Sequence, residues 1–494
     1  MGKRPNFLSR LLANPTRFTF ILAIATGLYP VIFYYSRNYP LINSWRHLLF
    51  FMALFMGVPV VVFGLLRLFF KLKWPDKNRM RVYTFLNVLF FLVFIQLCLY
   101  TRPQLWFTFG AVIVSFLVSG FLYSQLKKIV VFQWLLALVA VFWLVPVVQS
   151  QLNYSEAWLQ QPDEIEKVIF KTKPNIYFIQ PDGYVNFSEI DKGYYQIDNS
   201  EFKSFLQGQD FTIYPNFRSN YCTTLTSNAS VFSMKHHYYN NGFNFSERMN
   251  LREVIVSDNA VLRVLKNNGY KTHLLAEWAY LLANLPEMGY DECNFSYDEL
   301  PYLTTGLDEI REVAPYLEQA MQRDTLQPKF YFIELFLPGH IATTAAESAG
   351  VEGEKEWWTN NLRESNKKLE TLLSMIEDKD PNALVVLLSD HGGYVGMEYM
   401  SELRSKSNDR DKIYSAFSSL LAVKWPKEYA SNDELPFRSG VNFFRILFSQ
   451  LAVEPDYLDQ LQDDGSYHNV DRGAPKGVYQ YINGDGKIVF KLKN

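Results

Sequence analysis

The chain has 494 residues, and its formal net charge at pH 7 is −2, from 48 Lys and Arg against 50 Asp and Glu. This length exceeds one ordinary domain, so we expect at least two units. The near-neutral charge implies no nucleic-acid-binding surface, so we expect no nucleic-acid partner. The 3 cysteines are too few for a disulfide framework, so the fold must depend on an apolar core.

The first third of the chain is dominated by apolar stretches that are nearly free of charge. Each approaches the roughly 20 residues that an α-helix needs to cross a bilayer, where a central charge costs roughly 2.5–3.5 kcal/mol. We therefore predict that residues 1–150 form a transmembrane anchor of five helices. The stretches cover residues 17–36, 47–70, 82–100, 105–124 and 129–149.

Basic residues alternate between the loops of this anchor. The leading tail and the second and fourth loops are rich in Lys and Arg, whereas the other loops carry few. By the positive-inside rule the amino terminus is cytoplasmic, and an odd number of crossings exports everything after residue 150. No cleavage site follows the first stretch, so we expect a retained anchor. A juxtamembrane linker is predicted over residues 151–173, and an exported domain over residues 174–494.

Two apolar runs in the exported part end in acidic residues. Residues 174–184 lead to Asp182 and a glycine, and residues 385–393 lead to the adjacent pair Asp390 and His391, followed by two glycines. Continuous apolar runs predict strands buried on both faces, and parallel sheets place ligand chemistry at the carboxyl ends of such strands. We therefore expect these three side chains to converge on one divalent cation. The alternative is that they are ordinary turn and capping residues.

The rest of the exported part alternates between helical and strand patterns. Residues 260–268 and 362–376 have helical spacing, and residues 271–275 and 329–337 resemble further strands. Strands separated by helices favour an α/β domain with a mostly parallel sheet and helices on both faces. No Gly-rich nucleotide loop occurs, so we expect no nucleotide cofactor.

A hydroxyl-rich loop over residues 218–227 runs into a segment with helical spacing. This order places Thr226 or Ser227 near a helix amino terminus, where free N–H groups and the helix dipole favour an anion. Because coordination to a cation lowers the pKa of a hydroxyl, either residue is a candidate nucleophile. The alternative is an ordinary Ser or Thr N-cap.

Three ordered motifs, at residues 175–184, 219–234 and 388–393, resemble those of the alkaline phosphatase/sulfatase superfamily. More narrowly, they are similar to its membrane-embedded branch of lipoteichoic acid synthases and phosphoethanolamine transferases. The resemblance implies five membrane helices followed by a three-layer α/β/α domain. The Ser-Asp-His-Gly segment that contains Asp390 and His391 carries most of the specificity.

The resemblance also implies roles for individual residues. Asp182, Thr226 or Ser227, Asp390 and His391 match the positions that hold one divalent metal, Zn²⁺ or Mn²⁺, in that branch. The hydroxyl would take up the phosphoryl group and pass it to an acceptor. A further strand-end residue, His340, matches the histidine that contacts the substrate head group or the leaving group; the alternative is a loop histidine.

The sequence departs from the family pattern at several positions. Asp182 stands where the transferases usually have Glu, and Val231 stands where sulfatases have an arginine, so an ordinary sulfatase is disfavoured. The nucleophile is ambiguous by one residue. Cys222 is expected to be structural, and the sequence leaves open whether it pairs with Cys293 in an oxidising compartment. His236 and His237 are expected to be surface or packing residues, and His468 is a weaker candidate for the site.

These observations together predict a metal-dependent, membrane-anchored transferase. It would move a phospholipid-derived head group, phosphoethanolamine or phosphoglycerol, from a membrane lipid donor onto an exported glycan or lipid acceptor. Two alternatives remain: a hydrolase of sulfate or phosphate esters, and a non-catalytic lipid-binding regulator of the cell envelope. A five-helix anchor with an exported domain predicts a bacterial inner membrane, with the domain in the periplasm or outside the cell.

Overall fold

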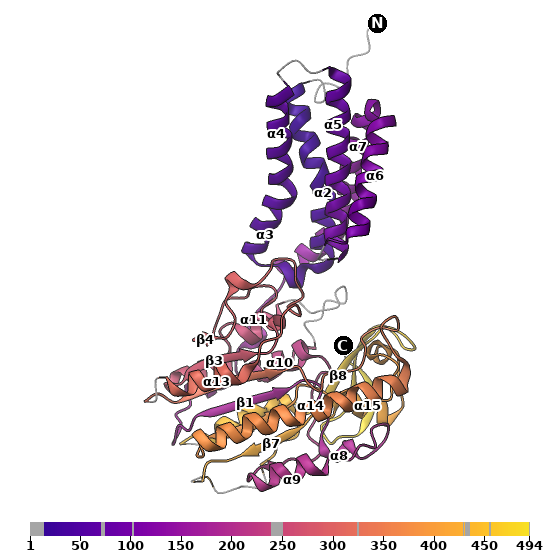
Figure 1. Ribbon diagram of the computed structural model, residues 1–494. Coiled ribbons are helices and arrows are strands. Elements are labelled where there is room, and N and C mark those ends of the chain that lie inside the picture. Colours follow the sequence, from indigo (N-terminus) through magenta and orange to yellow (C-terminus); the bar gives the residue numbers. More distant parts are fainter. Residues whose placement is uncertain are drawn as a thin grey trace.

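The computed structural model describes residues 14–70, 75–100, 103–238, 250–323, 326–427, 429, 435–453 and 456–493. A bundle of helices stands on one side of an α/β domain (Figure 1). The bundle comes first in the chain and all of the described strands follow it. This order is the one that the sequence predicts.

Four segments of the bundle are long and apolar enough to cross a membrane, namely Pro15–Ile42, Trp45–Phe70, Asp76–Tyr100 and Tyr123–Leu152. The second of them is continuous because a π-helical turn, Ala53–Gly57, joins α3 to α4. The helices are α2 (Pro15–Ile42), α3 (Trp45–Met52), α4 (Val58–Phe70), α5 (Asp76–Tyr100), α6 (Leu105–Phe121) and α7 (Leu126–Leu152).

The prediction of five spans is confirmed for four of them. The predicted stretch 105–124 does form an apolar helix, α6, but this helix has only 17 residues. The helix ends at Phe121, where the chain leaves the α-helical conformation, and a 3-10 turn at Tyr123–Gln125 then leads into α7. The described chain therefore has four candidate spans and one shorter apolar helix, rather than five long ones.

The surface of the bundle is apolar and its interior contains a polar contact. The outward-facing Phe109, Phe116 and Phe142 are 62%, 70% and 70% exposed, which suits hydrocarbon better than water. Inside, the amides of Asn87 on α5 and Gln133 on α7 exchange two hydrogen bonds of 3.0 Å. Such a pair satisfies two polar groups where no water is available.

The α/β domain is built on a seven-stranded sheet with the order β2-β7-β6-β1-β5-β3-β4. β1 lies in the middle, parallel to β5 and β6, and β7 runs antiparallel to its neighbours. The sheet is therefore mixed, with the parallel centre that the apolar runs predict. The strands are β1 (Ile176–Pro181), β2 (Thr212–Ile213), β3 (Lys271–Ala276), β4 (Glu292–Cys293), β5 (Lys329–Leu335), β6 (Leu384–Leu388) and β7 (Leu421–Lys424).

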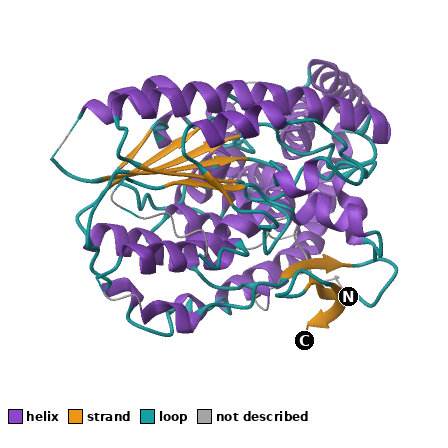
Figure 2. Ribbon diagram, turned by 90° about the horizontal axis from the view of Figure 1, so that it is seen from below, coloured by secondary structure: helices purple, strands orange, loops and turns teal. Residues whose placement is uncertain are grey.

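Helices cover both faces of this sheet, as the view from below shows (Figure 2). Residues of alternate strand positions enter two separate apolar cores, one on each face. The first core contains α10 (Thr224–Ser233), α11 (Leu251–Val256), α12 (Ala260–Asn267) and α16 (Phe443–Leu451). The second contains α8 (Phe187–Ile190), α9 (Ser200–Gly208), α13 (Val313–Gln322), α14 (Gly350–Lys379) and α15 (Arg410–Phe417).

A second, antiparallel sheet follows the main domain and has no counterpart in the sequence predictions. It contains β8 (Ser466–Val470), β9 (Gly477–Ile482) and β10 (Ile488–Lys493). β8 fastens the hydroxyl-rich loop from outside, because the Tyr467 N–H donates to the Asn220 carbonyl over 2.8 Å and the Ser466 hydroxyl donates to the Ser219 carbonyl over 2.7 Å.

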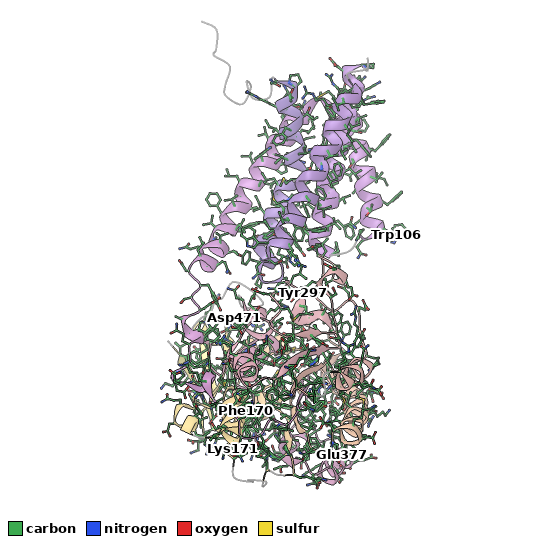
Figure 3. The ribbon with its side chains drawn as sticks, turned by 90° about the vertical axis from the view of Figure 1, so that its left-hand side faces the viewer. Trp106, Phe170, Lys171, Tyr297, Glu377 and Asp471 are labelled. Atoms are coloured by element: carbon green, nitrogen blue, oxygen red, sulfur yellow. The ribbon has the colours of Figure 1, made fainter. Side chains whose placement is uncertain are left out.

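The membrane bundle contacts the domain directly where α2 turns into α3. The Phe50 ring stacks on Tyr302 with 4.5 Å between centroids, and Arg46 lies 5.8 Å from the centroid of the Tyr297 ring. Tyr297 is seen on the side of the domain that faces the helices (Figure 3). The bundle is thus joined to the domain by side-chain packing as well as by the chain itself.

Candidate metal centre and active site

The candidate site lies at the carboxyl ends of β1 and β6. The parallel register that pairs Ile179 with Leu387 brings Asp182 and Asp390 to the same level just beyond the two strands. The N–H of Gly183 donates to Asp390 Oδ1 over 3.1 Å, so the turn after β1 holds the second carboxylate. Gly183 has φ +66°, and a Cβ there would lie 2.0 Å from the Gly339 oxygen, so only glycine allows this approach.

Three of the predicted ligands come together at this point. His391 Nε2 lies 3.4 Å from Asp182 Oδ1 and 3.3 Å from Asp390 Oδ2. One ligand atom from each residue lies within 4.8 Å of the others. The three residues are 3%, 1% and 0% exposed in the order Asp182, Asp390, His391, so water cannot replace a missing partner.

The hydrogen bonds around these residues leave three lone pairs facing one another. Asp390 Oδ1 accepts the N–H of His391 over 2.9 Å, and His391 Nδ1 lies 2.8 Å from the Gly392 carbonyl. Because a carbonyl only accepts, Nδ1 carries the proton and Nε2 carries a lone pair. Among the described residues, Asp182 Oδ1, Asp390 Oδ2 and His391 Nε2 are all buried without a hydrogen-bond partner. Such an arrangement is costly without a cation between the atoms, so the residues fit a divalent metal.

One further buried carboxyl group, that of Glu334, shares the environment of Asp182 and Asp390. Burial raises the pKa of Asp182 well above its usual range, and the charges of Asp390 and Glu334 add to the effect. Glu334 on β5 is 1% exposed, and neither of its carboxylate oxygens has a hydrogen-bond partner among the described residues. Burial raises its pKa as well, with Asp390 as the next cause. A cation at the site would reduce the repulsion that these groups exert on one another.

His340 lies beside the metal ligands, after the end of β5. Its ring centroid is 6.0 Å from that of His391, and its Nδ1 lies 2.8 Å from the Ile341 carbonyl. That carbonyl fixes the proton on Nδ1, so Nε2 carries a lone pair. Burial lowers the pKa of His340, and His391 lowers it further, which favours the neutral imidazole.

The two predicted nucleophiles use their hydroxyl groups within their own loop. Thr226 Oγ1 lies 2.7 Å from Thr223 Oγ1 and donates to the Thr223 carbonyl over 3.0 Å. The Ser227 hydroxyl donates to the Tyr221 carbonyl over 2.6 Å, and Ser227 is only 2% exposed. Both residues are near the start of α10, as predicted, but both act there as local hydrogen-bond donors.

A third hydroxyl, Thr224, was missed by the sequence reasoning. Asn228 of α10 exchanges hydrogen bonds of 2.7 Å with Gln180 of β1, and Phe232, one turn later, packs edge-on against Phe178. These contacts show that α10 runs antiparallel to β1. Thr224 precedes Asn228 by one helical turn, a rise of about 6 Å along α10. Asp182 follows Gln180 by two residues, a rise of about 6.6 Å in the same direction along β1. Thr224 is therefore level with Asp182.

Thr224 also has the environment of a reactive group. It is the first residue of α10, and its hydroxyl has no hydrogen-bond partner among the described residues. It is 8% exposed, whereas Ser227 is 2% exposed. The sequence does show that Thr224 and Asn228 are one helical turn apart and so lie on the same helix face. It does not show that Asn228 contacts Gln180 of β1, and this contact is what places Thr224 level with Asp182.

The loop before α10 is fastened to the metal side of the site. The Tyr394 phenol donates to the Cys222 carbonyl, and the Tyr394 ring lies 5.9 Å from the His391 ring. Cys222 Sγ lies 2.9 Å from Nδ1 of His468 on β8, so the second sheet brings this histidine to the loop. Cys222 and Cys293 are not joined by a disulfide.

His236 and His237 have structural partners. His236 Nε2 lies 2.6 Å from the Asp463 carbonyl, and His237 Nε2 lies 2.7 Å from the Thr226 carbonyl. The His237 ring stacks on Tyr221 with 4.1 Å between centroids. Both histidines therefore pack behind the loop, the role that the sequence predicts for them.

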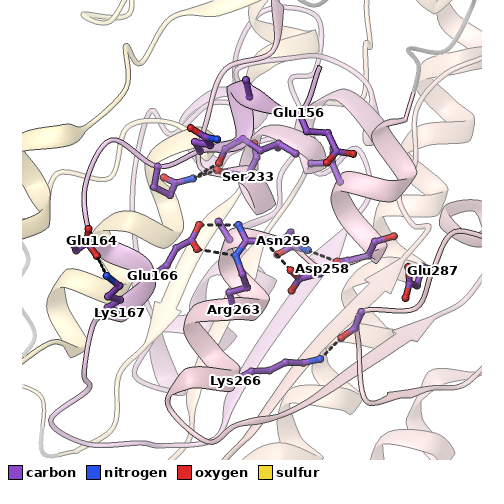
Figure 4. A pocket seen from close by; sticks show the side chains of 18 of the residues that line it. Glu156, Glu164, Glu166, Lys167, Ser233, Asp258, Asn259, Arg263, Lys266 and Glu287 are labelled. Atoms are coloured by element: carbon purple, nitrogen blue, oxygen red, sulfur yellow. Dashed lines mark hydrogen bonds and ion pairs between the residues drawn. The ribbon is translucent and has the colours of Figure 1, made fainter. Parts of the chain in front are cut away.

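A large polar cavity of about 1050 Å³ lies away from the metal ligands, between the linker and α11 and α12. Several of its charged side chains are paired with one another, including Lys167 with Glu164 and Arg263 with Glu166 and Asp258 (Figure 4). Arg263 makes two hydrogen bonds to Glu166, of 2.9 and 2.8 Å, and one of 3.0 Å to Asp258. These pairs tie the linker to the domain, and we assign no chemistry to this cavity.

Comparison with known proteins gives structural neighbours only. No family model matches the sequence, and no curated protein matches it. The C-terminal periplasmic domain of EptC from Escherichia coli is similar at 12% identity and a TM-score of 0.43, covering 63% of this chain and 93% of that one. The lipoteichoic acid synthase LtaP from Listeria monocytogenes is similar at 15% identity and a TM-score of 0.41, covering 66% and 91%.

A third neighbour includes a membrane part. It is the integral membrane lipooligosaccharide phosphoethanolamine transferase A from Neisseria meningitidis, at 12% identity and a TM-score of 0.41, covering 84% of this chain and 76% of that one. These neighbours are the kinds of protein that the sequence resemblance names. With scores below 0.5, we base the proposed function on the residues of the site itself.

Proposed function

We propose that this protein is a metal-dependent, membrane-anchored transferase. It moves a phospholipid-derived head group, phosphoethanolamine or phosphoglycerol, from a membrane lipid onto an exported glycan or lipid. The observation that carries this proposal is the set of three unpartnered ligand atoms of Asp182, Asp390 and His391, level with a hydroxyl at a helix amino terminus. Mixed nitrogen and oxygen ligands suit Zn²⁺ or Mn²⁺.

The chain's own residues supply a consistent transfer reaction. A bound divalent ion supplies Lewis acidity and charge neutralisation for a phosphoryl group. The hydroxyl oxygen of Thr224 attacks the phosphorus, and the bond from phosphorus to the lipid glycerol oxygen breaks. His340 Nε2 takes the hydroxyl proton and delivers it to the departing glycerol oxygen. The acceptor hydroxyl then attacks the phosphothreonine, and the threonine hydroxyl is restored with the acceptor's proton.

The start of α10 contributes to this reaction through its backbone. The first N–H groups of a helix have no intrahelical partners, so beside Thr224 they would stabilise negative charge on a phosphoryl group. Thr224 is the first residue of that helix, and Thr226 and Ser227 are its third and fourth residues. We keep Thr226 and Ser227 as candidate nucleophiles beside Thr224, and the level of Thr224 with Asp182 favours Thr224.

We further propose that the protein crosses a bacterial inner membrane five times. At a rise of about 1.5 Å per residue, the 17 residues of α6 span about 26 Å, close to the roughly 30 Å of hydrocarbon. Five crossings with basic cytoplasmic loops place the amino terminus in the cytoplasm and the α/β domain on the exported side. The anchor then keeps the site at the surface where a lipid donor lies.

The test is a search for the covalent intermediate. The full-length protein in detergent is incubated with phosphatidylethanolamine or phosphatidylglycerol and with Zn²⁺ or Mn²⁺, and its intact mass is measured. We expect a head-group adduct that is lost in Thr224→Ala and kept in Thr226→Ala and Ser227→Ala. Loss in one of the latter two instead would move the nucleophile. No adduct in any protein, together with no bound metal, would overturn the transferase in favour of the lipid-binding regulator.

A further inference from the structure

The membrane bundle contains an apolar groove that has no role in the chemistry described above. It has a volume of about 890 Å³, which is in the range of ligand pockets, and it lies between α2, α7 and the segment formed by α3 and α4. Along α2 the groove extends from Phe20 to Tyr39 and on to Asn43, beyond the helix end. From Leu28 to Asn43 the chain rises about 22 Å, more than the roughly 15 Å of one leaflet.

The groove ends at the junction with the α/β domain, where its wall becomes polar. Asn43 lines the groove, and its Nδ2 donates to Glu253 Oε1 over 3.0 Å. Asn284 Nδ2 donates to the same oxygen over 2.8 Å and to Asn43 Oδ1 over 2.9 Å. A carboxylate is therefore held one hydrogen bond behind the mouth of an apolar groove.

The other oxygen of this carboxylate has no partner. Glu253 Oε2 is buried and makes no hydrogen bond to any described residue. Asn43 and Asn284 both donate to Oε1, so only one of the two oxygens is satisfied, and burial raises the pKa of Glu253. A buried anionic oxygen without a donor is costly, and a cationic group with N–H donors would remove that cost.

We propose that the groove holds an acyl chain of a membrane lipid with an ammonium head group, and that Glu253 binds this ammonium. The inference rests on the proposed transferase function and deepens it, because it selects a phosphoethanolamine lipid as the donor over a phosphoglycerol lipid. Both lipids carry an anionic phosphate, but only phosphoethanolamine has a cation, so a phosphoglycerol lipid would leave Glu253 Oε2 without a partner. The two parts of the ligand match the two parts of the site, apolar in the bundle and anionic at the junction.

The junction is connected to the metal ligands by a short series of contacts. The neighbour of Glu253, Arg252, lies 4.8 Å from the centroid of the Tyr280 ring, and Tyr280 packs edge-on against Phe336 with 6.0 Å between centroids. Phe336 follows β5 at the level of Asp182, since the register pairs Pro181 with Leu335. The segment that carries Glu253 is thus joined through two ring contacts to the strand ends that carry the site.

Lipid binding to the full-length protein tests this inference without any reaction. Native mass spectrometry with a chelator present compares phosphatidylethanolamine, phosphatidylglycerol and N-acetylated phosphatidylethanolamine, which has the same chains but no cation. We expect wild-type protein to prefer the first lipid by about tenfold or more, the effect of one charge-assisted hydrogen bond. Glu253→Gln keeps both accepted hydrogen bonds and should abolish the preference while leaving phosphatidylglycerol binding unchanged.

A matched pair of glycines tests the groove itself. Gly57 lines the groove, and a Cβ there would meet only the Met52 oxygen at 3.9 Å, so Gly57→Phe should fill the groove and weaken binding of all three lipids. Gly64 has open space around it and does not line the groove, so Gly64→Phe should bind as wild type does. Equal binding of the three lipids by wild type, a preference retained in Glu253→Gln, or normal binding by Gly57→Phe would each overturn the inference. The adduct experiment tests the transferase separately.

Discussion

Replacing Asp182 by Asn removes the charge of a predicted metal ligand and keeps its shape. In the metal-free protein, Asp182 and Asp390 face each other with ligand atoms at most 4.8 Å apart. Two full charges at that distance repel by roughly 3.5 kcal/mol at an effective dielectric constant of about 20. Burial, and then the charge of Asp390, raises the pKa of Asp182, so protonation relieves part of this repulsion. We therefore expect metal-free Asp182→Asn to be at least as stable as the metal-free wild type.

With metal present, the order of stability reverses. Removing a group that hydrogen-bonds to a metal ligand lowers metal affinity by about 10–100-fold. Removing the ligand Asp182 itself should therefore lower the affinity by at least about 100-fold. At a metal concentration of 100 times its Kd, the wild type gains about 2.7 kcal/mol, and a variant that binds 100-fold more weakly gains about 0.4 kcal/mol. Urea unfolding of the full-length protein in detergent, with chelator or with Zn²⁺ or Mn²⁺, measures both differences.

The control is Asp191→Asn, an exposed aspartate at the end of α8. This variant should match the wild type with and without metal. The reasoning fails if metal-free Asp182→Asn is more than about 1 kcal/mol less stable than the wild type, because the site would then need the charge for another reason. It also fails if the metal stabilises Asp182→Asn as much as it stabilises the wild type.

Two further substitutions test the supports of the site by urea unfolding. Gly183→Ala should lower the free energy of unfolding by at least about 2 kcal/mol and weaken metal binding, because the added Cβ would lie 2.0 Å from a backbone oxygen. The control is Gly269→Ala, at φ +83° with open space around it, which should lower it by only about 1–2 kcal/mol through backbone strain. Glu277→Gln should lower the free energy of unfolding by about 1–3 kcal/mol, because this buried carboxylate accepts the Phe336 N–H over 2.8 Å and pairs with Lys368. The control is Glu364→Gln, which breaks an exposed ion pair and should lower it by less than about 1 kcal/mol. Equal losses within either pair would contradict the assignment.

The metal ligands could be predicted from sequence because strand ends are local features. Asp182 follows one apolar run, and Asp390 and His391 follow another. Parallel pairing of those two strands is then enough to bring the three side chains together, and β1 and β6 are indeed neighbours. An apolar run over residues 416–423 does predict a late strand where β7 lies, but its antiparallel direction was not predictable, because an apolar run does not show strand direction, and β2 has only two residues.

The nucleophile could not be chosen from sequence because neighbouring hydroxyls on one loop look alike. Thr224, Thr226 and Ser227 all lie in the first four residues of α10. What separates them is the contact of Asn228 with Gln180, which joins residues 48 positions apart and sets the level of the helix against β1. Glu334 was not predicted as part of the site for a similar reason. A single acidic residue within a strand can be assigned to a site only when the neighbouring strands are known.

The anchor and the site are parts of one continuous structure, and this explains why the strand order matters for function. β5 lies between β1, which carries Asp182, and β3, whose following turn contains Tyr280. The same turn region carries Asn284, which binds the bundle residue Asn43. β3, the strand that leads into this turn, is therefore only two strands from β1 and the metal ligands. A shift of the bundle on the domain would be transmitted to the site through β3 and β5, whereas the linker reaches the domain on the side of α12. We conclude that packing at the junction, more than the linker, sets the position of the site relative to the membrane.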